Sequence, residues 1–408
     1  MKFSKLSQLF LVSTIGLLVA TLLTACEIVT IDYVFVASSA GSGTSSAGQI
    51  QTYDADSETG ALRSGQPTVL SGGSNPVSIA ITSDYANLYV ANQGNNSVVH
   101  FAIAGTGVLT QKDLVTTTTK PVFLAVNTPG TYLYVVSGTS SATLTEYSLS
   151  SGTIGTAASQ LTLSVPGYAG DTIVPTGVTV LANNATVSGN AVYVTAYDQS
   201  AYNPGGTTTS TANPGWVFGY TVGSSGALAA VSGSPWKAGV KPTAIAADPT
   251  DRFVYVTDYA SNELIGYTIQ SGSILNFLTN GPFKTGNEPS AIVIDPRGKY
   301  IYLTNSLDST VSAWSIDLAT GTPTGTANVV GSAANSTDTQ PVSLVVDPAL
   351  GRFVYTANHL GNSVSGFRLD PDNGSLSTTQ ATPYPTGSQP TAVTAVPHGN
   401  YSVQSVTP

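Results

Sequence analysis

The sequence predicts an all-β protein, a seven-bladed β-propeller of four-stranded antiparallel blades. A proline followed by a short apolar strand recurs seven times, at intervals of 45 to 67 residues. Six of these strands are followed by a second strand that starts with an aliphatic residue and a tyrosine. No stretch after residue 26 shows a sustained 3.6-residue hydrophobic period, so helices are not expected. Four short strands per repeat of about 50 residues are typical of propeller blades.

The first element, residues 1–25, is predicted to be a lipoprotein signal peptide. Lys2 and Lys5 precede an uncharged apolar run of 15 residues, from Leu9 to Leu23. This run is shorter than the ~20 residues of a membrane span. It ends in Leu-Thr-Ala before Cys26, the only cysteine of the chain, as in the bacterial lipobox. We therefore predict lipidation of Cys26, with residues 26–31 as lipidated N-terminus and short tether. This predicts export and a membrane anchor in the cell envelope, with the outer membrane or the cell surface favoured.

The next elements are the first and second strands of each repeat. The first strands follow anchor prolines, which are Pro76, Pro121, Pro175, Pro242, Pro289, Pro341 and Pro390. The second strands start at Leu88, Leu133, Val192, Val254, Ile301 and Val354. A seventh second strand, from Val34, has no anchor before it.

Two classes of turn connect the strands. Asp-Pro turns, such as the one at Asp295, join first to second strands, because proline presets φ for a tight turn. Ser-Gly and Thr-Gly turns follow the third strands, which alternate apolar and polar residues as half-buried strands do. The propeller is predicted to span residues 32–396, followed by a tail at 397–408. The strand at 390–396, which follows the seventh anchor proline, should pair with the strand from Val34. It would complete the first blade and so remove two exposed sheet edges.

Composition excludes several classes of function. The net charge is −9, with only 13 Lys and Arg residues, whereas nucleic-acid binding needs clustered cations. One cysteine excludes an internal disulfide framework and a thiolate zinc site. The three histidines, His100, His359 and His398, have no metal-ligand spacing. We therefore predict no nucleic-acid partner, no metal and no cofactor.

The repeat resembles a known family. Residues 350–367 combine the Gly-Arg turn, the Tyr-Thr-Ala-Asn strand and an alternating third strand. This pattern is similar to the YVTN-type repeat and to the lactonase-family propellers that include 6-phosphogluconolactonases. The resemblance covers about residues 32–396 and implies a lactone hydrolase with Arg, His and Glu near the channel. No anchor proline is followed by Arg or His here, so no catalytic residue is transferred from the resemblance.

Topology predicts which polar residues lie together. In a propeller, the second-to-third and fourth-to-first loops surround one mouth of the central channel, which we call the channel face. A carboxylate beside His or Lys at this mouth can act as a general base or bind a ligand. The catalytic candidates are therefore His359, Glu288 and Asp258, and the ligand-binding candidates on the last three blades are Lys241, Asn305, Asp308, Asn358 and His359. The alternative is that these residues are ordinary polar loop residues that do not form one common site.

The fourth second-to-third loop, residues 196–215, is much longer than the others. Loops of this length are usually functional or disordered. Tyr197, Asp198 and Tyr202 could stack on and hydrogen-bond a sugar, whereas the Gly and Thr content fits a mobile lid equally well.

Three hypotheses for function follow. The favoured one is a lipid-anchored, non-enzymatic propeller that binds an envelope protein or a glycan on its channel face. The alternative is a lactone hydrolase resembling 6-phosphogluconolactonase. A surface-layer component is disfavoured, because the chain is long enough for only one propeller.

Overall fold

The computed structural model describes residues 29–40, 47–139, 141–167, 172–182, 191–202, 214–223, 225–325 and 335–399. The predicted signal peptide and the lipidation site at Cys26 lie outside these ranges, as does most of the tail. Within them the protein is all-β, and its helical content is limited to 3₁₀ turns such as η1 (Gln93–Asn95).

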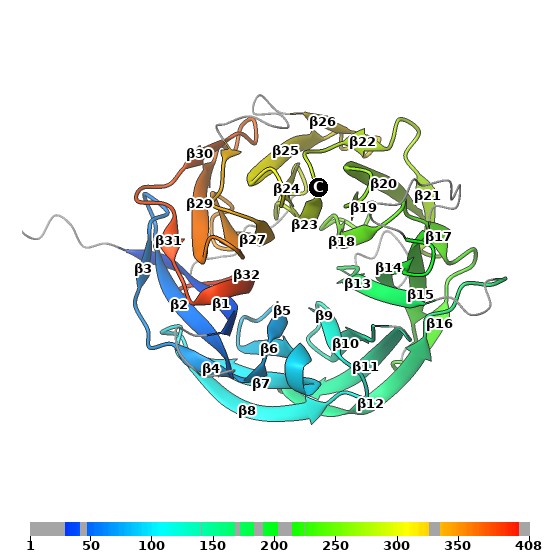
Figure 1. Cartoon of the computed structure of the whole chain (residues 1–408), viewed down its shortest axis with the longest axis horizontal. Coiled ribbons are helices and arrows are strands. Elements are labelled where there is room, and N and C mark those ends of the chain that lie inside the picture. Colours follow the sequence, from blue (N-terminus) through cyan, green and yellow to red (C-terminus); the bar gives the residue numbers. More distant parts are fainter. Residues whose placement is uncertain are drawn as a thin grey trace, which may run out of the picture.

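Seven sheets surround a central axis, as the sequence predicts (Figure 1). Each blade is given from its inner to its outer strand, with a further paired segment last where there is one. Blade A has β32 (Ser388–Pro397), β1 (Thr30–Ala40), β2 (Ala47–Asp56), β3 (Leu62–Ser64) and β4 (Val69–Ser74); blade B has β5 (Pro76–Ile81), β6 (Asn87–Asn92), β7 (Ser97–Ile103) and β8 (Leu109–Thr116); blade C has β9 (Pro121–Val126), β10 (Tyr132–Ser137), β11 (Thr143–Ser150) and β12 (Thr153–Thr162).

The second half of the ring repeats this plan. Blade D has β13 (Ile173–Val180), β14 (Ala191–Asp198), β15 (Gly215–Val222), β16 (Leu228–Ala230) and β17 (Trp236–Lys237); blade E has β18 (Pro242–Ala247), β19 (Phe253–Asp258), β20 (Glu263–Gln270), β21 (Ile274–Phe277) and β22 (Phe283–Lys284); blade F has β23 (Pro289–Ile294), β24 (Tyr300–Asn305), β25 (Thr310–Ile316) and β26 (Pro323–Gly325); blade G has β27 (Pro341–Val346), β28 (Phe353–Asn358), β29 (Ser363–Leu369), β30 (Leu376–Thr378) and β31 (Tyr384–Pro385).

The C-terminal strand closes the ring, which confirms the predicted topology. β32 pairs antiparallel with β1, with Val34 opposite Ala395 and Val36 opposite Val393. The two strands lie side by side in Figure 1, blue against red. The first blade is thus built from both ends of the propeller, and the inner edge of β1 is covered by β32.

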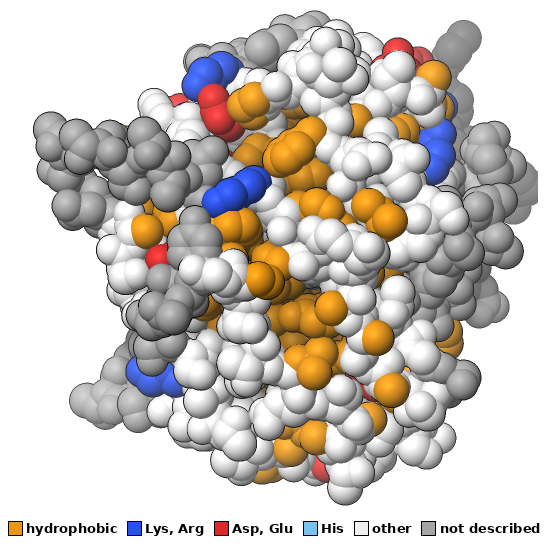
Figure 2. All heavy atoms as spheres, turned by 90° about the vertical axis from the view of Figure 1, so that its right-hand side faces the viewer, with side chains coloured by type: hydrophobic (Ala, Val, Ile, Leu, Met, Phe, Trp, Pro, Cys, Tyr) orange, Lys and Arg blue, Asp and Glu red, His pale blue; other side chains and the backbone are white. Residues whose placement is uncertain are grey.

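The core lies between the blades rather than inside them. Tyr134 and Val136 of blade C, for example, pack with Val192 and Trp216 of blade D. Each sheet buries both of its faces against its neighbours, so few positions are left for charges. Figure 2 looks at the side of the molecule that is on the right in Figure 1, where hydrophobic side chains form a band and charged ones are sparse. The composition of 9% charged residues is consistent with this packing.

The repeated tyrosine of the second strands ties each blade to the next. In five of the seven seams its hydroxyl donates to a carbonyl in the third-to-fourth turn of the following blade, at 2.6–2.9 Å; the pairs are Tyr89 with Gly152, Tyr193 with Ser273, Tyr255 with Gly321, Tyr302 with Gly374 and Tyr355 with Gly60. The turn needs glycine for two reasons. At Gly321, φ is +75° and an added Cβ would lie 2.4 Å from the Phe253 ring.

Two seams depart from this pattern. In blade A the corresponding residue is Phe35, which has no hydroxyl. In blade C, Tyr134 has the fully buried Glu146 opposite it on β11, and a Cβ on Gly226 would lie 2.4 Å from a carboxylate oxygen of Glu146. A titratable group therefore lies in the C–D seam where five other seams have a neutral hydrogen bond.

We expect the substitution Tyr255→Phe to destabilise the fold by about 1–3 kcal/mol, because it leaves a buried carbonyl without its donor. The free energy of unfolding from urea titration is the measurement. Tyr147→Phe is the matched control, since no hydrogen bond of the Tyr147 hydroxyl is found in the described part of the chain. Equal stability of the two variants would show that the interblade bond contributes nothing.

Candidate functional site

In six of the seven blades, the last residue of the second strand is a polar side chain on the channel face, and it is buried. Asp258 and Asp198, which the sequence predicts as candidates, are 0% and 3% exposed. The Asp258 carboxylate accepts the N–H groups of Val240 and Lys241 at 2.8 and 2.9 Å. Asp198 accepts the N–H and the hydroxyl of Ser200 at 2.9 and 2.6 Å. Both carboxylates shape the loops of the channel face instead of facing a ligand.

Three more of the predicted ligand-binding residues also hold loops in place. The Asn305 amide donates to Thr310 and Ser312 at 3.0 and 2.8 Å. The Asn358 amide makes the equivalent bonds in blade G, to Ser363 and Ser365. Asp308 accepts the backbone and side-chain N–H groups of Asn287 at 2.7 and 2.8 Å.

Lys241, Tyr197 and Tyr202 lie together on the channel face. The Lys241 ammonium lies 5.7 Å and 5.0 Å from the ring centroids of Tyr197 and Tyr202, and 4.4 Å from that of Tyr259. The rings of Tyr197 and Tyr202 meet edge to face at 5.6 Å. We call Tyr197, Tyr202, Lys241, Tyr259 and Glu288 the tyrosine–lysine site; it spans blades D, E and F.

Glu288 supplies the carboxylate of this site. It precedes Pro289 at the start of β23, is half-buried, and has φ of +56°. Its backbone N–H donates to Asn262 Oδ1 at 2.8 Å, and Ser306 Oγ donates to its carbonyl oxygen at 3.0 Å. The left-handed backbone is therefore held from two neighbouring loops, which directs the side chain across the channel face.

The electrostatics of the tyrosine–lysine site favour neutral tyrosine hydroxyls beside the one cation, Lys241. Burial raises the pKa of Tyr259 to about 12, and a hydrogen bond to the Glu288 carboxylate adds to the effect. Burial also raises the pKa values of Tyr197 and Tyr202. Burial lowers the pKa of Lys241, and the nearby charge of Glu288 opposes that shift. Lys241 and Glu288 do not form a direct ion pair, so both charged groups are available to a ligand that lies between them.

His359 lies apart from the tyrosine–lysine site. Its Nδ1 is 3.1 Å from the carbonyl oxygen of Pro390 in β32, so this nitrogen carries a proton and donates. In the described ranges, His359 makes no hydrogen bond or ion pair with Glu288 or Asp258. The structure thus does not assemble the predicted histidine–carboxylate pair, because blade G turns this side chain towards blade A.

Tyr259 was missed by the sequence analysis, although a signal existed. It directly follows the second strand of its blade, at the repeat position that Ser306 and His359 occupy in the next two blades. Aligning the seven loops by this position would have placed it on the channel face.

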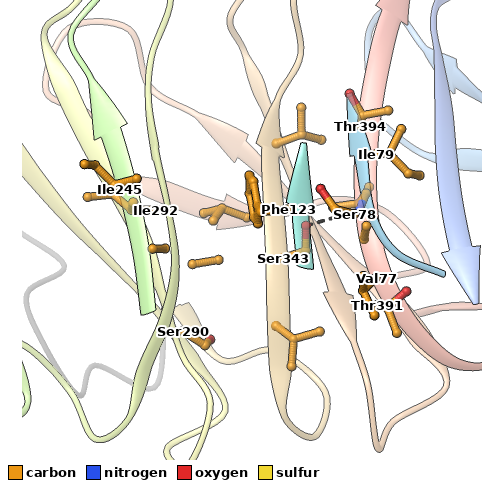
Figure 3. A pocket seen from close by; sticks show the side chains of 17 residues that line it. Val77, Ser78, Ile79, Phe123, Ile245, Ser290, Ile292, Ser343, Thr391 and Thr394 are labelled. Atoms are coloured by element: carbon orange, nitrogen blue, oxygen red, sulfur yellow. Dashed lines mark hydrogen bonds between the residues drawn. The ribbon is translucent and has the colours of Figure 1, made fainter. Parts of the chain in front are cut away.

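A cavity of about 240 Å³ lies in the channel (Figure 3). It is lined by six of the seven inner strands, and none of its lining side chains is charged. In the described part of the chain, no group of three or more His, Cys, Asp or Glu side chains could hold a metal ion. The same part contains no helix long and apolar enough to cross a membrane.

Solved structures share this fold. The periplasmic gluconolactonase of Pseudomonas aeruginosa has a TM-score of 0.72 and 18% identity, with 90% of this chain and 99% of that chain covered. A candidate 6-phosphogluconolactonase of Bacteroides uniformis has a TM-score of 0.70 and 17% identity over the same shares. A Lactobacillus plantarum protein without a stated activity has a TM-score of 0.71 and 17% identity, again over 90% and 99%. At these identities the TM-scores show a shared fold alone.

No curated protein sequence matches the chain significantly. The family model described as "Lactonase, 7-bladed beta-propeller" matches residues 40–169 and 230–405, about three quarters of the chain. The matched ranges include Lys241, Tyr259 and Glu288 but not Tyr197 and Tyr202, which lie in the unmatched residues 170–229, most of blade D. The chain belongs to the family of lactonase-type seven-bladed β-propellers.

Proposed function

We propose that the tyrosine–lysine site hydrolyses a small lactone. The observation that carries this proposal is a half-buried carboxylate, Glu288, beside a half-buried ammonium, Lys241, that does not pair with it. Membership of the lactonase family supports the reaction class. The relatives named as gluconolactonases support a lactone substrate.

In this mechanism Glu288 is the general base. It takes a proton from water as the water oxygen bonds to the lactone carbonyl carbon. The resulting oxyanion is stabilised by the Lys241 ammonium and by the neutral hydroxyl of Tyr202. When the ring C–O bond breaks, the protonated Glu288 returns its proton to the leaving alkoxide, which yields a hydroxy acid and restores the site. Tyr259 orients Glu288 through their hydrogen bond.

Binding without turnover is the second candidate function. Three tyrosine rings offer stacking faces to a glycan or a protein segment. Leu307 and Leu360, on the channel-face loops of blades F and G, are 65% and 57% exposed. A pH-stat assay with gluconolactone, 6-phosphogluconolactone and simple γ- and δ-lactones separates the two, because a purely binding protein produces no acid above the buffer rate.

We expect Lys241→Met to lower kcat for lactone hydrolysis by about 10- to 1,000-fold, because the oxyanion loses its cation. Methionine keeps the apolar stem that packs among the tyrosines. Lys284→Met is the control, since Lys284 pairs with Glu263 at 2.8 Å on the rim of blade E. Unchanged kcat in the Lys241 variant, measured by pH-stat, would remove Lys241 from the mechanism.

The lipid anchor remains part of the proposal. β1 starts at Thr30, opposite Asp56, at the end of the propeller that carries the third-to-fourth turns. The four residues from Cys26 to Thr30 span at most ~14 Å. A lipid on Cys26 would hold this turn end near a membrane and leave the tyrosine–lysine site directed away from it. The periplasmic relative supports export. Cys26→Ala should move the protein from the membrane fraction to the soluble fraction; retention in the membrane fraction would reject the anchor.

A further inference from the structure

The channel cavity is reached from the tyrosine–lysine site along strand β23, within two residues of Glu288. Ser290, which lines it, lies two residues after Glu288 on β23. Its lining is mainly aliphatic and aromatic, with Val77, Ile79, Phe123, Ile245 and Ile292 labelled in Figure 3. A polar, titratable site therefore neighbours, along β23, a cavity with a mainly apolar lining.

Four of the five hydroxyl groups of the lining are already hydrogen-bonded, and no hydrogen bond of the fifth, on Thr394, is found in the described part of the chain. Ser290 Oγ donates to the Pro341 carbonyl at 2.8 Å, and Thr391 Oγ1 donates to the Pro76 carbonyl at 2.7 Å. Ser343 Oγ accepts the N–H of Val393 at 3.1 Å, the bond drawn dashed in Figure 3. Ser78 makes the same kind of bond with Leu124 N–H in the neighbouring blade. These bonds link adjacent inner strands, so the hydroxyls stabilise the ring and leave few polar groups to hold water.

We propose that this cavity is a subsite for the alkyl chain of a ligand whose polar end lies at the tyrosine–lysine site. An apolar protein cavity of about 150 Å³ stays dry and binds benzene. By that scale, about 240 Å³ has room for on the order of nine carbon atoms. The ligand class is then an alkyl-substituted lactone. The assignment of the lactone group rests on the proposed function, whereas the assignment of the alkyl chain rests on the cavity alone.

The test uses straight-chain alcohols from butan-1-ol to dodecan-1-ol, which bear the chain without a lactone. Isothermal titration calorimetry is expected to show one saturable site with a negative heat-capacity change. The Kd should fall about fourfold with each added CH₂ until the cavity is full, and then level off. Since no turnover is measured, a failure of lactone hydrolysis leaves this result intact.

Two variants at one position locate the site. Val77→Phe fills the cavity from β5 and should weaken octan-1-ol binding at least tenfold, whereas Val77→Ala enlarges it and should retain binding. Circular dichroism and thermal melting establish that both variants fold. Absence of saturable binding in the wild-type protein, or equal affinity in the Val77→Phe variant, overturns the proposal.

Discussion

Glu288→Gln is expected to lower kcat for lactone hydrolysis by about 100- to 10,000-fold, the usual contribution of a general base. The amide keeps the size of the side chain and can still accept the hydrogen bond of Tyr259, but it cannot take a proton from water. The fold should be unaffected, because the backbone of Glu288 is held by Asn262 and Ser306. The measurement is initial rate in a pH-stat at constant pH, with the melting temperature recorded beside it.

Two further variants make this test specific. Glu263→Gln removes a carboxylate from the rim of blade E and should leave kcat unchanged. His359→Ala should also leave kcat unchanged, because this imidazole donates to the Pro390 carbonyl instead of joining the tyrosine–lysine site. A large loss of activity in the His359 variant with none in the Glu288 variant would place the reaction on blades G and A and refute our assignment of the base.

Glu146→Gln is expected to raise the free energy of unfolding at pH 8 by about 3 kcal/mol, with almost no effect near pH 4.5. Burial raises the pKa of Glu146 from its ordinary value of 4.5 to about 7, and the Tyr134 hydroxyl offsets a part of that shift. Since the folded-state pKa is the higher one, the acid form contributes stability that is complete below the unfolded pKa of 4.5. That stability is lost as the pH rises towards and through 7. A shift of this size corresponds to about 3 kcal/mol.

Urea titrations of both proteins at pH 4.5, 6 and 8 provide the measurement. The wild-type protein should lose stability relative to the glutamine variant over this range, and the two should converge at acid pH. Tyr134→Phe in each background reports how much the neighbouring hydroxyl contributes. A wild-type stability that rises with pH relative to the glutamine variant would mean that Glu146 is stabilised as a carboxylate in the C–D seam.

The strand order could be predicted because each part of it has a local cause. Proline presets φ at Pro289 or Pro341, a turn aspartate such as Asp295 accepts the N–H groups of Lys299 and Tyr300 at 2.7 and 2.8 Å, and alternation sets which residues are buried. The closure by β32 also followed from the sequence. The C-terminus carries a first strand with no second strand after it, and the N-terminus carries a second strand with no first strand before it. The role of the repeated tyrosines did not follow from the sequence, because their partners lie in the next blade, 63 to 80 residues away in four pairs and 295 residues away in the fifth.

The sequence predicted that the site residues lie on one face of the propeller, but not which of them contact one another. Lys241, Glu288, Tyr197 and Tyr202 meet, whereas Asp198, Asp258, Asn305 and Asn358 on the same face are buried in loop-shaping hydrogen bonds. Sequence alone does not separate these groups, because a polar residue at a strand end can turn into its own loop or out of it. That choice depends on which N–H groups the neighbouring blade leaves without a partner.

The sequence by itself thus determined the all-β class, the seven blades, the phase that closes the ring and the face on which polar groups gather. These properties are periodic, and the forces that set them act over a few residues. The tertiary structure decided which side chains meet: the three tyrosines around Lys241, the separation of His359 from Glu288, the buried Glu146 and the apolar channel. Each of these depends on the angle and distance between blades, which are set by interblade packing that no single repeat encodes.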